Sequence, residues 1–436
     1  MRASPWWFPL FQHRSRALSF ATTAAAVAAG VVAPAAYLLG TTFCYWLTAP
    51  PTKNDSDCNN MIVVKLIAGL AALVLGADML VRGATRLAAA WGVSPLLVGL
   101  TIVAFGTSAP ELAVSVSSGL SGQAEIALGN VLGSNIFNVL FILGISAVVV
   151  PLVVDQKLVR LDVPLMIGIS AATLGFAADG RVGRLEGLVL VAGLAAYVGW
   201  CILAGRKEPP PVQAEYDIAF GEHRGRDPET NLLSGTLQWA CQAGLIVGGL
   251  ILLVAGSIWF VGGAADIARY WGVSELVVGL TIVAGGTSLP ELATSVVAAI
   301  RGERDIAVGN VVGSNIFNLL GVLGLTAVVA PDGVAVSPQA LRFDIPVMLA
   351  TAVACLPVFF TGHCIARWEG ALFSGYYAAY TATLVMMATQ SDSLAIFRPL
   401  MLGLVLPLTA ITLAVIAVRA KRTSPPLRTN SATEPR

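Results

Sequence analysis

GTSAPELA at Gly106 to Ala113 and GTSLPELA at Gly286 to Ala293 decide the fold, because each places a proline and a glutamate inside a long apolar segment. Residues 91–140 align without a gap on residues 271–320, each position shifted by 180, with 34 identities in 50 positions. GNVLGSNIFN, which begins at Gly129, likewise recurs as GNVVGSNIFN from Gly309. This degree of identity indicates an internal duplication.

The composition indicates a chain whose solvent is lipid. Hydrophobic residues make up 56% of the 436 residues and charged residues only 12%, whereas soluble domains carry about 25% charged residues. Segments of about 20 apolar residues cross a bilayer core, and they predict eleven or twelve transmembrane helices, centred near residues 32, 71, 104, 137, 169, 195, 250, 285, 317, 352, 377 and 407. The net charge of +1, without a basic face, argues against nucleic acid as a partner.

The basic residues set the orientation of these helices. With a cytoplasmic amino terminus, 19 of the 26 Lys and Arg residues fall on the cytoplasmic side, as the positive-inside rule requires. We therefore expect a multi-pass protein of the plasma (inner) membrane with both termini in the cytoplasm.

Two features near the amino terminus each leave an alternative open. The apolar run from Ala17 to Thr48 is predicted to be an extra transmembrane helix, and a cleaved signal peptide is the alternative. None of the six cysteines forms a CxxC pair; Cys44 and Cys58 flank a short polar loop, where either two free thiols or a disulfide would fit.

The duplication predicts two halves of opposite orientation, because five spans, an odd number, separate equivalent points of the two copies. Inverted repeats are typical of transporters, which bind substrate near the membrane midplane between the repeats; a duplicated bundle without transport is the alternative. The predicted units are residues 1–60 with the extra helix, 61–205 as the first repeat, 206–237 as a polar cytoplasmic linker, 238–388 as the second repeat, and 389–436 with an extra helix and a basic tail. The sequence carries no signal for an oligomeric state.

Glu111 and Glu291 lie in the middle of predicted spans. A carboxylate at that depth costs about 2.5 to 3.5 kcal/mol on insertion scales. Neither of these two spans has a Lys or Arg at comparable depth, so the charge is expected to be balanced by a bound cation or a proton. A permanently protonated, structural pair is the alternative.

The prolines before these glutamates predict a break in each helix. Pro110 and Pro290 have no N–H for the carbonyls of Gly106 and Gly286, so each helix has to bend there. The bend is expected to turn backbone oxygens inward beside four hydroxyls, those of Thr107, Ser108, Thr287 and Ser288.

Polar stripes on the following spans add further oxygens. Asn130, Ser134 and Asn138 recur at every fourth position, and so do their equivalents Asn310, Ser314 and Asn318. Such stripes can also serve helix packing. Together with two carboxylates and no thiol or imidazole, they predict a site for a hard cation: Ca²⁺ takes six to eight oxygens, and Na⁺ accepts the same ligands.

At these motifs the chain resembles the Ca²⁺/cation antiporter superfamily, in its prokaryotic sodium/calcium exchanger branch, over residues 61–388. The resemblance implies an all-α membrane protein of two inverted five-helix repeats, with the second, third, seventh and eighth of ten core helices lining the ion site. The extra N-terminal and C-terminal transmembrane helices exceed this core.

The resemblance also implies a role for each motif residue. Glu111 and Glu291 would bind Ca²⁺ with the carbonyls of Ala104 and Ala284 and the hydroxyls of Thr107 and Thr287. Overlapping Na⁺ sites would use Ser108, Ser134, Ser288 and Ser314, and Asn138 would line the middle of the cavity. Asn318 departs from the pattern, because several exchangers carry Asp there, and this leaves the ion ratio and any K⁺ requirement open.

The expected function is sodium/calcium antiport by alternating access, with no cofactor besides the transported Ca²⁺ and Na⁺ and no enzymatic activity. Ca²⁺/H⁺ exchange is the alternative within transport, because buried glutamates can carry protons. A passive cation channel and a membrane scaffold that binds Ca²⁺ without moving it are the alternatives of other classes.

Overall fold

The computed structural model describes residues 55–91, 93–204, 235–360 and 363–405, together with 407 and 409. The predicted helix near residue 32, Cys44, most of the linker at 206–237 and the basic tail lie outside these residues. Within them Cys201, Cys241, Cys355 and Cys364 are free thiols.

Almost every described element is a helix, and many helices include a single π-helical turn. The first half contains α3 (Asp55–Trp91), α4 (Pro95–Val98), η2 (Gly99–Val103), α5 (Ala104–Thr107), α6 (Ala109–Leu120), α7 (Ala124–Phe137), η3 (Asn138–Ile142), α8 (Leu143–Val149), η4 (Leu158–Asp162), α9 (Val163–Phe176), η5 (Ala177–Asp179) and α10 (Arg184–Ala204). The second half contains α12 (Gly235–Tyr270), α13 (Glu275–Val278), η9 (Gly279–Val283), α14 (Ala284–Gly286), α15 (Leu289–Ile300), α16 (Arg304–Phe317), η10 (Asn318–Leu323), α17 (Gly324–Val329), η11 (Ala340–Asp344), α18 (Ile345–Phe360), α19 (Arg367–Ala388), α20 (Leu394–Leu400) and η12 (Met401–Val405).

Seven described helices are long and apolar enough to cross a membrane, or eight if the bent pair Pro95–Thr107 and Ala109–Leu120 is one span. The sequence predicted eleven or twelve. The predicted span near residue 32 and part of the one near 407 lie outside the described residues. In the second motif segment only the short helix Leu289–Ile300 is apolar, and α19, near residue 377, is long enough but not apolar enough to be counted. The chain is a multi-pass integral membrane protein with an all-helical core.

Short β-strands, which the sequence analysis did not predict, tie the halves together. β1 (Leu152–Val153) pairs with β4 (Cys364–Ile365), and β2 (Arg181–Val182) pairs with β3 (Val334–Ala335), both antiparallel. Each pair joins a loop of one half to a loop of the other. Strands of two residues are too short to show the alternating pattern by which strands are recognised in a sequence.

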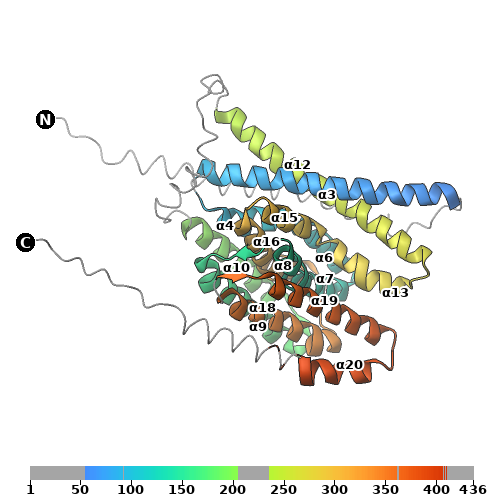
Figure 1. The fold of residues 1–436 in the computed structure, drawn as a ribbon. Helices are drawn as coiled ribbons and strands as arrows, with labels where there is room; N and C mark the ends of the chain where they lie inside the picture. Colours follow the sequence, from blue (N-terminus) through green and yellow to red (C-terminus); the bar gives the residue numbers. More distant parts are fainter. Residues whose placement is uncertain are drawn as a thin grey trace, which may run out of the picture.

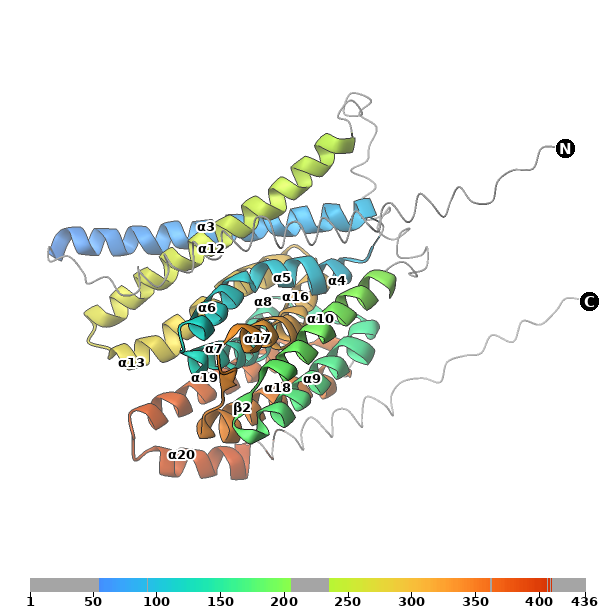
Figure 2. The same cartoon turned by 180° about the vertical axis from the view of Figure 1, so that it is seen from behind.

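The two longest helices, α3 and α12, cross each other along one edge of the bundle (Figures 1 and 2). Glycines spaced seven residues apart bring their backbones into contact. A Cβ atom on Gly76 would lie 2.7 Å from the carbonyl oxygen of Gly249, and one on Gly256 would lie 2.8 Å from that of Gly69. Since Gly69 faces Gly256 while Gly76 faces Gly249, α3 and α12 run antiparallel. Small residues that allow such close approach are a general means of packing helices in lipid.

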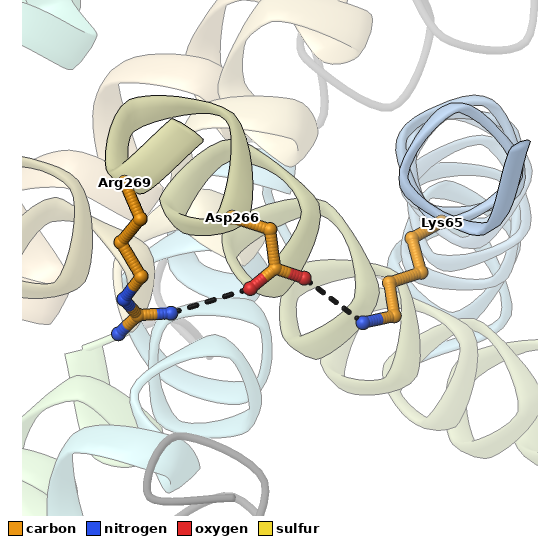
Figure 3. A network of polar contacts seen from close by, with 3 residues as sticks. All are labelled: Lys65, Asp266 and Arg269. Atoms are coloured by element: carbon orange, nitrogen blue, oxygen red, sulfur yellow. Dashed lines mark hydrogen bonds and ion pairs between the residues drawn. The ribbon is translucent and has the colours of Figure 1, made fainter. Parts of the chain in front are cut away.

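Ion pairs also connect these long helices. Figure 3 shows Lys65 of α3 reaching across to Asp266 of α12, with 3.0 Å between Nζ and Oδ2, while Arg269 contacts the other carboxylate oxygen at 3.3 Å. The aspartate and both of its basic partners are partly exposed, so the contribution of each pair to stability is small. The network instead fixes the relative position of α3 and α12 at this end.

A second group of charges joins α3 to the end of α15. Asp78 pairs with Arg82 at 2.9 Å and also with Arg301, the residue that follows α15. In the adjacent turn, burial and the neighbouring charge of Asp305 raise the pKa of Glu303 to about 7. The charge of this turn therefore changes near neutral pH, next to the contact between α3 and α15.

The core of the bundle is formed by α7 and α16 with the π-helical turns that continue them. In the apolar windows of Ala124–Val149 and Arg304–Val329, 78% and 89% of the residues are buried, against 22% to 39% for the other five spans. These two central helices carry the polar stripes identified in the sequence, so the stripes face protein and not lipid.

Substitution of one of the glycines between α3 and α12 is expected to weaken the contact of these helices. In Gly256→Ala the added Cβ meets backbone atoms that cannot move independently, and the change should lower the free energy of unfolding by about 1 to 3 kcal/mol. Gly262→Ala is the matched control on the same helix, because nothing lies within 4 Å of its Cβ position. Thermal unfolding of the purified protein in detergent checks this. Equal melting temperatures for the two variants would contradict the close packing.

Candidate functional site

Both motif helices break where the prolines predicted. α5 ends at Thr107 and α6 begins at Ala109, with a bend of 45° between the two segments. The residue at the break, Ser108, has φ −82° and ψ 8°, and its equivalent Ser288 has φ −91° and ψ 11°. Each glutamate then lies in the first turn of the new helix, where free N–H groups and the positive end of the helix dipole favour a negative charge.

The two glutamates are bonded across the boundary between the halves. Ser108 Oγ donates to Glu291 Oε1 at 3.0 Å, and Ser288 Oγ donates to Glu111 Oε1 at 2.9 Å. All four residues are fully buried. Since each serine lies three residues before the glutamate of its own half, these crossed bonds bring the two carboxylates to one place.

The motif threonines also form hydrogen bonds across the boundary, each to a stripe asparagine of the opposite half. Thr107 Oγ1 lies 3.1 Å from Asn310 Oδ1, and Thr287 Oγ1 lies 3.3 Å from Asn130 Oδ1. Thr107 Oγ1 is also 3.1 Å from the carbonyl oxygen of Val103 in its own helix. Both halves are thus bonded to each other by hydroxyls on either side of the carboxylates.

Asn130 and Asn310 are fixed at their amide nitrogens by their own halves. Asn130 Nδ2 donates to the Glu111 carbonyl at 3.2 Å and to Ser115 Oγ at 3.0 Å. In the second half Asn310 Nδ2 makes the equivalent bonds, to the Glu291 carbonyl at 3.3 Å and to Ser295 Oγ at 3.0 Å. The backbone of each glutamate is therefore held by an asparagine.

Ser134, Ser314, Asn138 and Asn318 lie on the central helices, which pack against the broken ones: α7 against α6 and α14, and α16 against α15 and α5. All four are buried. The amide nitrogens of Asn138 and Asn318 donate to Asn315 Oδ1 and Asn135 Oδ1.

Six buried oxygens of the predicted site accept no hydrogen bond. They are Glu111 Oε2, Glu291 Oε2, Ser134 Oγ, Ser314 Oγ, Asn138 Oδ1 and Asn318 Oδ1. A buried acceptor without a partner costs about 1 to 3 kcal/mol. These six atoms form three pairs of equivalent positions, one member from each half, and all are the hard oxygen donors that Ca²⁺ and Na⁺ prefer.

Among the described residues, the ion pairs leave both motif carboxylates without a basic partner. The described ion pairs link Lys65, Arg82, Arg269 and Arg301 to aspartates, and none involves Glu111 or Glu291. No group of three or more His, Cys, Asp or Glu side chains capable of holding a metal occurs in the described part of the chain. The donor set of the site is therefore two carboxylates with neutral oxygens.

The backbone carbonyls differ from the expectation in the second half. Pro290 does free the carbonyl of Gly286, but that oxygen accepts a hydrogen bond of 2.5 Å from Ser257 of α12. The carbonyl of Ala104 also accepts bonds within its own half, from Ser108 N–H at 3.0 Å and from Thr107 Oγ1 at 3.3 Å. The prediction of a free, inward-facing carbonyl is therefore wrong for Gly286, because α12 lies close enough for Ser257 to donate to it.

The halves also differ in exposure, although their motifs match. Gly99 and Ala104 are buried, whereas their equivalents Gly279 and Ala284 are exposed. α13 lies at one end of the bundle, next to the end of α12 (Figure 1). At these two positions the segment before the first break is therefore more buried than the segment before the second break.

Sequence reasoning missed several residues of this network. Asn130 and Asn310 were noted in the stripes but not assigned to the site, and Ser115, Ser295, Asn135 and Asn315 were not identified. The repetition of each residue at a spacing of 180 was a usable signal. Asn135 and Asn315 were overlooked because they lie one residue off the stripe.

Comparison with known proteins places this arrangement in a family. A family model described as "Sodium/calcium exchanger protein" matches residues 61–203 and 242–386, one match for each half. The chain belongs to the sodium/calcium exchanger family. It is accordingly a membrane cation/calcium exchanger, an antiporter, and not an enzyme.

Relatives of this exchanger cover most of its length. It is 39% identical to the putative antiporter CaxA of Alkalimonas amylolytica over 67% of this chain and 87% of the relative. It is 36% identical to the inner membrane protein YrbG of Escherichia coli, over 74% and 96%. The solved structure of the sodium/calcium exchanger from Methanococcus jannaschii has a similar fold, with a TM-score of 0.61 and 28% identity over 74% of this exchanger and 98% of that chain.

Removal of a crossed bond is expected to destabilise the cation-free exchanger. Ser108→Ala leaves Glu291 Oε1 without its donor, which should lower the free energy of unfolding by about 1 to 3 kcal/mol. Ser117→Ala, a partly exposed serine of the same region of α6, is the control and should change it by less than about 0.5 kcal/mol. Thermal unfolding in buffer without Na⁺ and Ca²⁺ measures both. An equal loss in the two variants would argue against a specific contact.

Proposed function

We propose that this exchanger moves Ca²⁺ against Na⁺ by alternating access, with both ions competing for one site between Glu111 and Glu291. The observation that carries the proposal is the set of six unpartnered buried oxygens arranged in equivalent pairs. Such a set is unfavourable by itself and becomes favourable when a cation accepts its lone pairs. The name of a relative, the sodium/calcium exchanger MaX1 of Methanosarcina acetivorans, which is 33% identical over 73% of this chain, supports the same pair of ions.

The proposed ligands are the carboxylates with the oxygens that surround them. Each half contributes one carboxylate, two hydroxyls at the break, one stripe serine, one stripe asparagine and one backbone carbonyl. The set is Glu111, Thr107, Ser108, Ser134, Asn138 and the carbonyl of Ala104, with Glu291, Thr287, Ser288, Ser314, Asn318 and the carbonyl of Ala284.

The charge of the site suits competition between the two ions. Two carboxylates and neutral oxygens carry a formal charge of −2, which one Ca²⁺ or two Na⁺ would neutralise. The Ser108 and Ser288 hydroxyls each donate to one oxygen of a carboxylate. A bound cation can share these oxygens, since each carboxylate oxygen has a second lone pair.

The unequal exposure of the halves supports alternating access. In our proposal the second half is inverted relative to the first, so Ala104 and Ala284 lie on opposite sides of the carboxylates. The exposed Ala284 side is then open and the buried Ala104 side is closed. Because α3 and α12 touch backbone to backbone, we propose that they move as a unit when access changes sides.

The membrane orientation is part of the proposal. The distribution of Lys and Arg puts the termini in the cytoplasm, so the open side faces outward. The inner membrane is the proposed location, as for the relative YrbG. We also propose that the chain divides into a first repeat at residues 61–205, a cytoplasmic linker at 206–237 and a second repeat at 238–388. An extra transmembrane helix would lie at each end.

Glutamine in place of either glutamate should abolish exchange. Glu111→Gln and Glu291→Gln keep the size of the side chain but remove a charge that a cation requires, and Ca²⁺ uptake should fall by at least about 100-fold, as expected for a loss of about 3 kcal/mol. Glu125→Gln, an exposed glutamate of the first half, is the control. The measurement is ⁴⁵Ca uptake into vesicles loaded with Na⁺, with the pH gradient collapsed.

Three results of this flux assay would contradict the proposal. Uptake that requires only a pH gradient would indicate Ca²⁺/H⁺ exchange. Uptake without any counter-ion gradient, accompanied by single-channel currents, would indicate a channel. Full uptake by Glu111→Gln or Glu291→Gln would remove these carboxylates from the site.

A further inference from the structure

Asn135 and Asn315 are equivalent buried asparagines behind the proposed ligands, with 2% and 3% of their surface exposed. Each follows directly after a stripe serine, so its side chain points about 100° away from the stripe. Neither belongs to the proposed ligand set. The described hydrogen-bond contacts of both side chains, however, run to the opposite half of the exchanger.

Methionine sulfurs face the amide nitrogens of these asparagines. Asn315 Nδ2 lies 3.5 Å from Met166 Sδ, and Asn135 Nδ2 lies 3.6 Å from Met348 Sδ, with a further contact of 3.5 Å to the carbonyl oxygen of Asn315. A thioether has no hydrogen to donate and only weak lone pairs. An amide oxygen turned toward it would meet another acceptor, so the methionines favour the orientation in which Nδ2 faces the sulfur.

This orientation directs both amide oxygens toward the site. Asn135 Oδ1 accepts from Asn318 Nδ2 at 3.2 Å, and Asn315 Oδ1 accepts from Asn138 Nδ2 at 3.0 Å. With their nitrogens held in this way, Asn138 and Asn318 keep Oδ1 as a buried oxygen without a hydrogen-bond partner. A rotation of either amide by about 180° would instead present an NH₂ group, which repels a cation.

We infer that Asn135 and Asn315 are positioning residues that hold the amides of Asn318 and Asn138 with their oxygens available to the transported cation. The inference rests on the proposed function, because it assumes a cation at these oxygens. It extends that function by assigning the orientation of the neutral ligands to residues outside the ligand set, each acting across the boundary between the halves.

The same contact accounts for the asparagine at position 318. Because Asn135 presents an acceptor there, the residue at 318 has to supply an N–H or O–H donor. An ionised carboxylate would place two acceptors 3.2 Å apart, which is unfavourable in a buried site. Position 138 meets the same requirement from Asn315. The amides of Asn318 and Asn138 both supply this donor, and as neutral groups they keep the formal charge of the site at −2.

A double-mutant cycle separates positioning from a structural role. Asn318→Ala removes the ligand and should weaken Ca²⁺ binding about tenfold. Asn135→Leu keeps the volume but frees the Asn318 amide to rotate, and should weaken binding about five- to tenfold. Since Asn135 acts only through Asn318, the double variant should match Asn318→Ala within about twofold. The readouts are equilibrium Ca²⁺ binding to the purified full chain and the KM for Ca²⁺ in vesicles, which should rise while the maximal rate stays within about twofold.

Thr326→Val is the control for loss of a buried polar group, because the Thr326 hydroxyl is fully buried and bonds only within its own helix, to the carbonyl of Val322. It should leave Ca²⁺ binding unchanged. If Asn135→Leu fails to fold, Asn315→Leu with Asn138→Ala provides the equivalent cycle in the other half.

The outcomes distinguish this inference from the proposed function. Effects that multiply, giving about 50- to 100-fold in the double variant, or normal binding by Asn135→Leu, would overturn the positioning role while leaving exchange intact. Absence of Ca²⁺ binding and flux in the unmodified exchanger would overturn the proposed function, and the inference with it.

Discussion

The hydrogen bond from each motif serine to the glutamate of the opposite half is the contact on which the centre of the exchanger depends. A buried carboxylate needs donors or positive charge, and the described residues offer these two carboxylates no basic partner. Ser108 and Ser288 supply one donor each, which satisfies Oε1 and leaves Oε2 free. Because each glutamate takes its donor from the other half, neither half can satisfy its carboxylate alone. The packing of the two halves therefore both buries the carboxylates and brings them together.

The hydrogen bonds around the two carboxylates are symmetric between the halves, but the burial and neighbours of the motif segments are not. Equivalent residues make equivalent bonds around the carboxylates, yet Ala104 is buried and Ala284 is exposed, and Ser257 bonds the Gly286 carbonyl where the first half has Ala77. In the proposed mechanism the inverted halves exchange these two environments while the proposed ligands stay the same. In the proposed alternating access, contacts without an equivalent in the repeat, such as those of Asp78 with Arg301 and of Ser257 with Gly286, would contribute to the energy difference between the two arrangements. An exchanger requires this energy difference to be small. Ion binding can shift the populations of the two arrangements only by the difference in its binding free energy between them.

The sequence predicted the helical class, the duplication, the bends and the pairing of the glutamates, because each rests on strong local chemistry. Proline in the middle of an apolar span favours a bend or break, as at Pro110 and Pro290. A glutamate repeated 180 residues apart in apolar surroundings favours a cation site. The contacts that depend on how helices pack could not be predicted. Asn135 lies off the polar stripe, its role depends on Met348 of another helix, and the bond from Ser257 depends on how closely α12 approaches Gly286. The two-residue strands and the seven-residue glycine spacing of α3 and α12 likewise gained meaning only from the three-dimensional arrangement.

The central claim is that Glu111 and Glu291 are assembled to hold one cation between them. Crystals of the exchanger soaked in Sr²⁺, which substitutes for Ca²⁺ and scatters anomalously, test it most directly. The account predicts one strong anomalous peak within bonding distance of both carboxylates, reduced by excess Na⁺. A peak bound elsewhere, with the two carboxylates turned apart or paired with basic side chains, would contradict it.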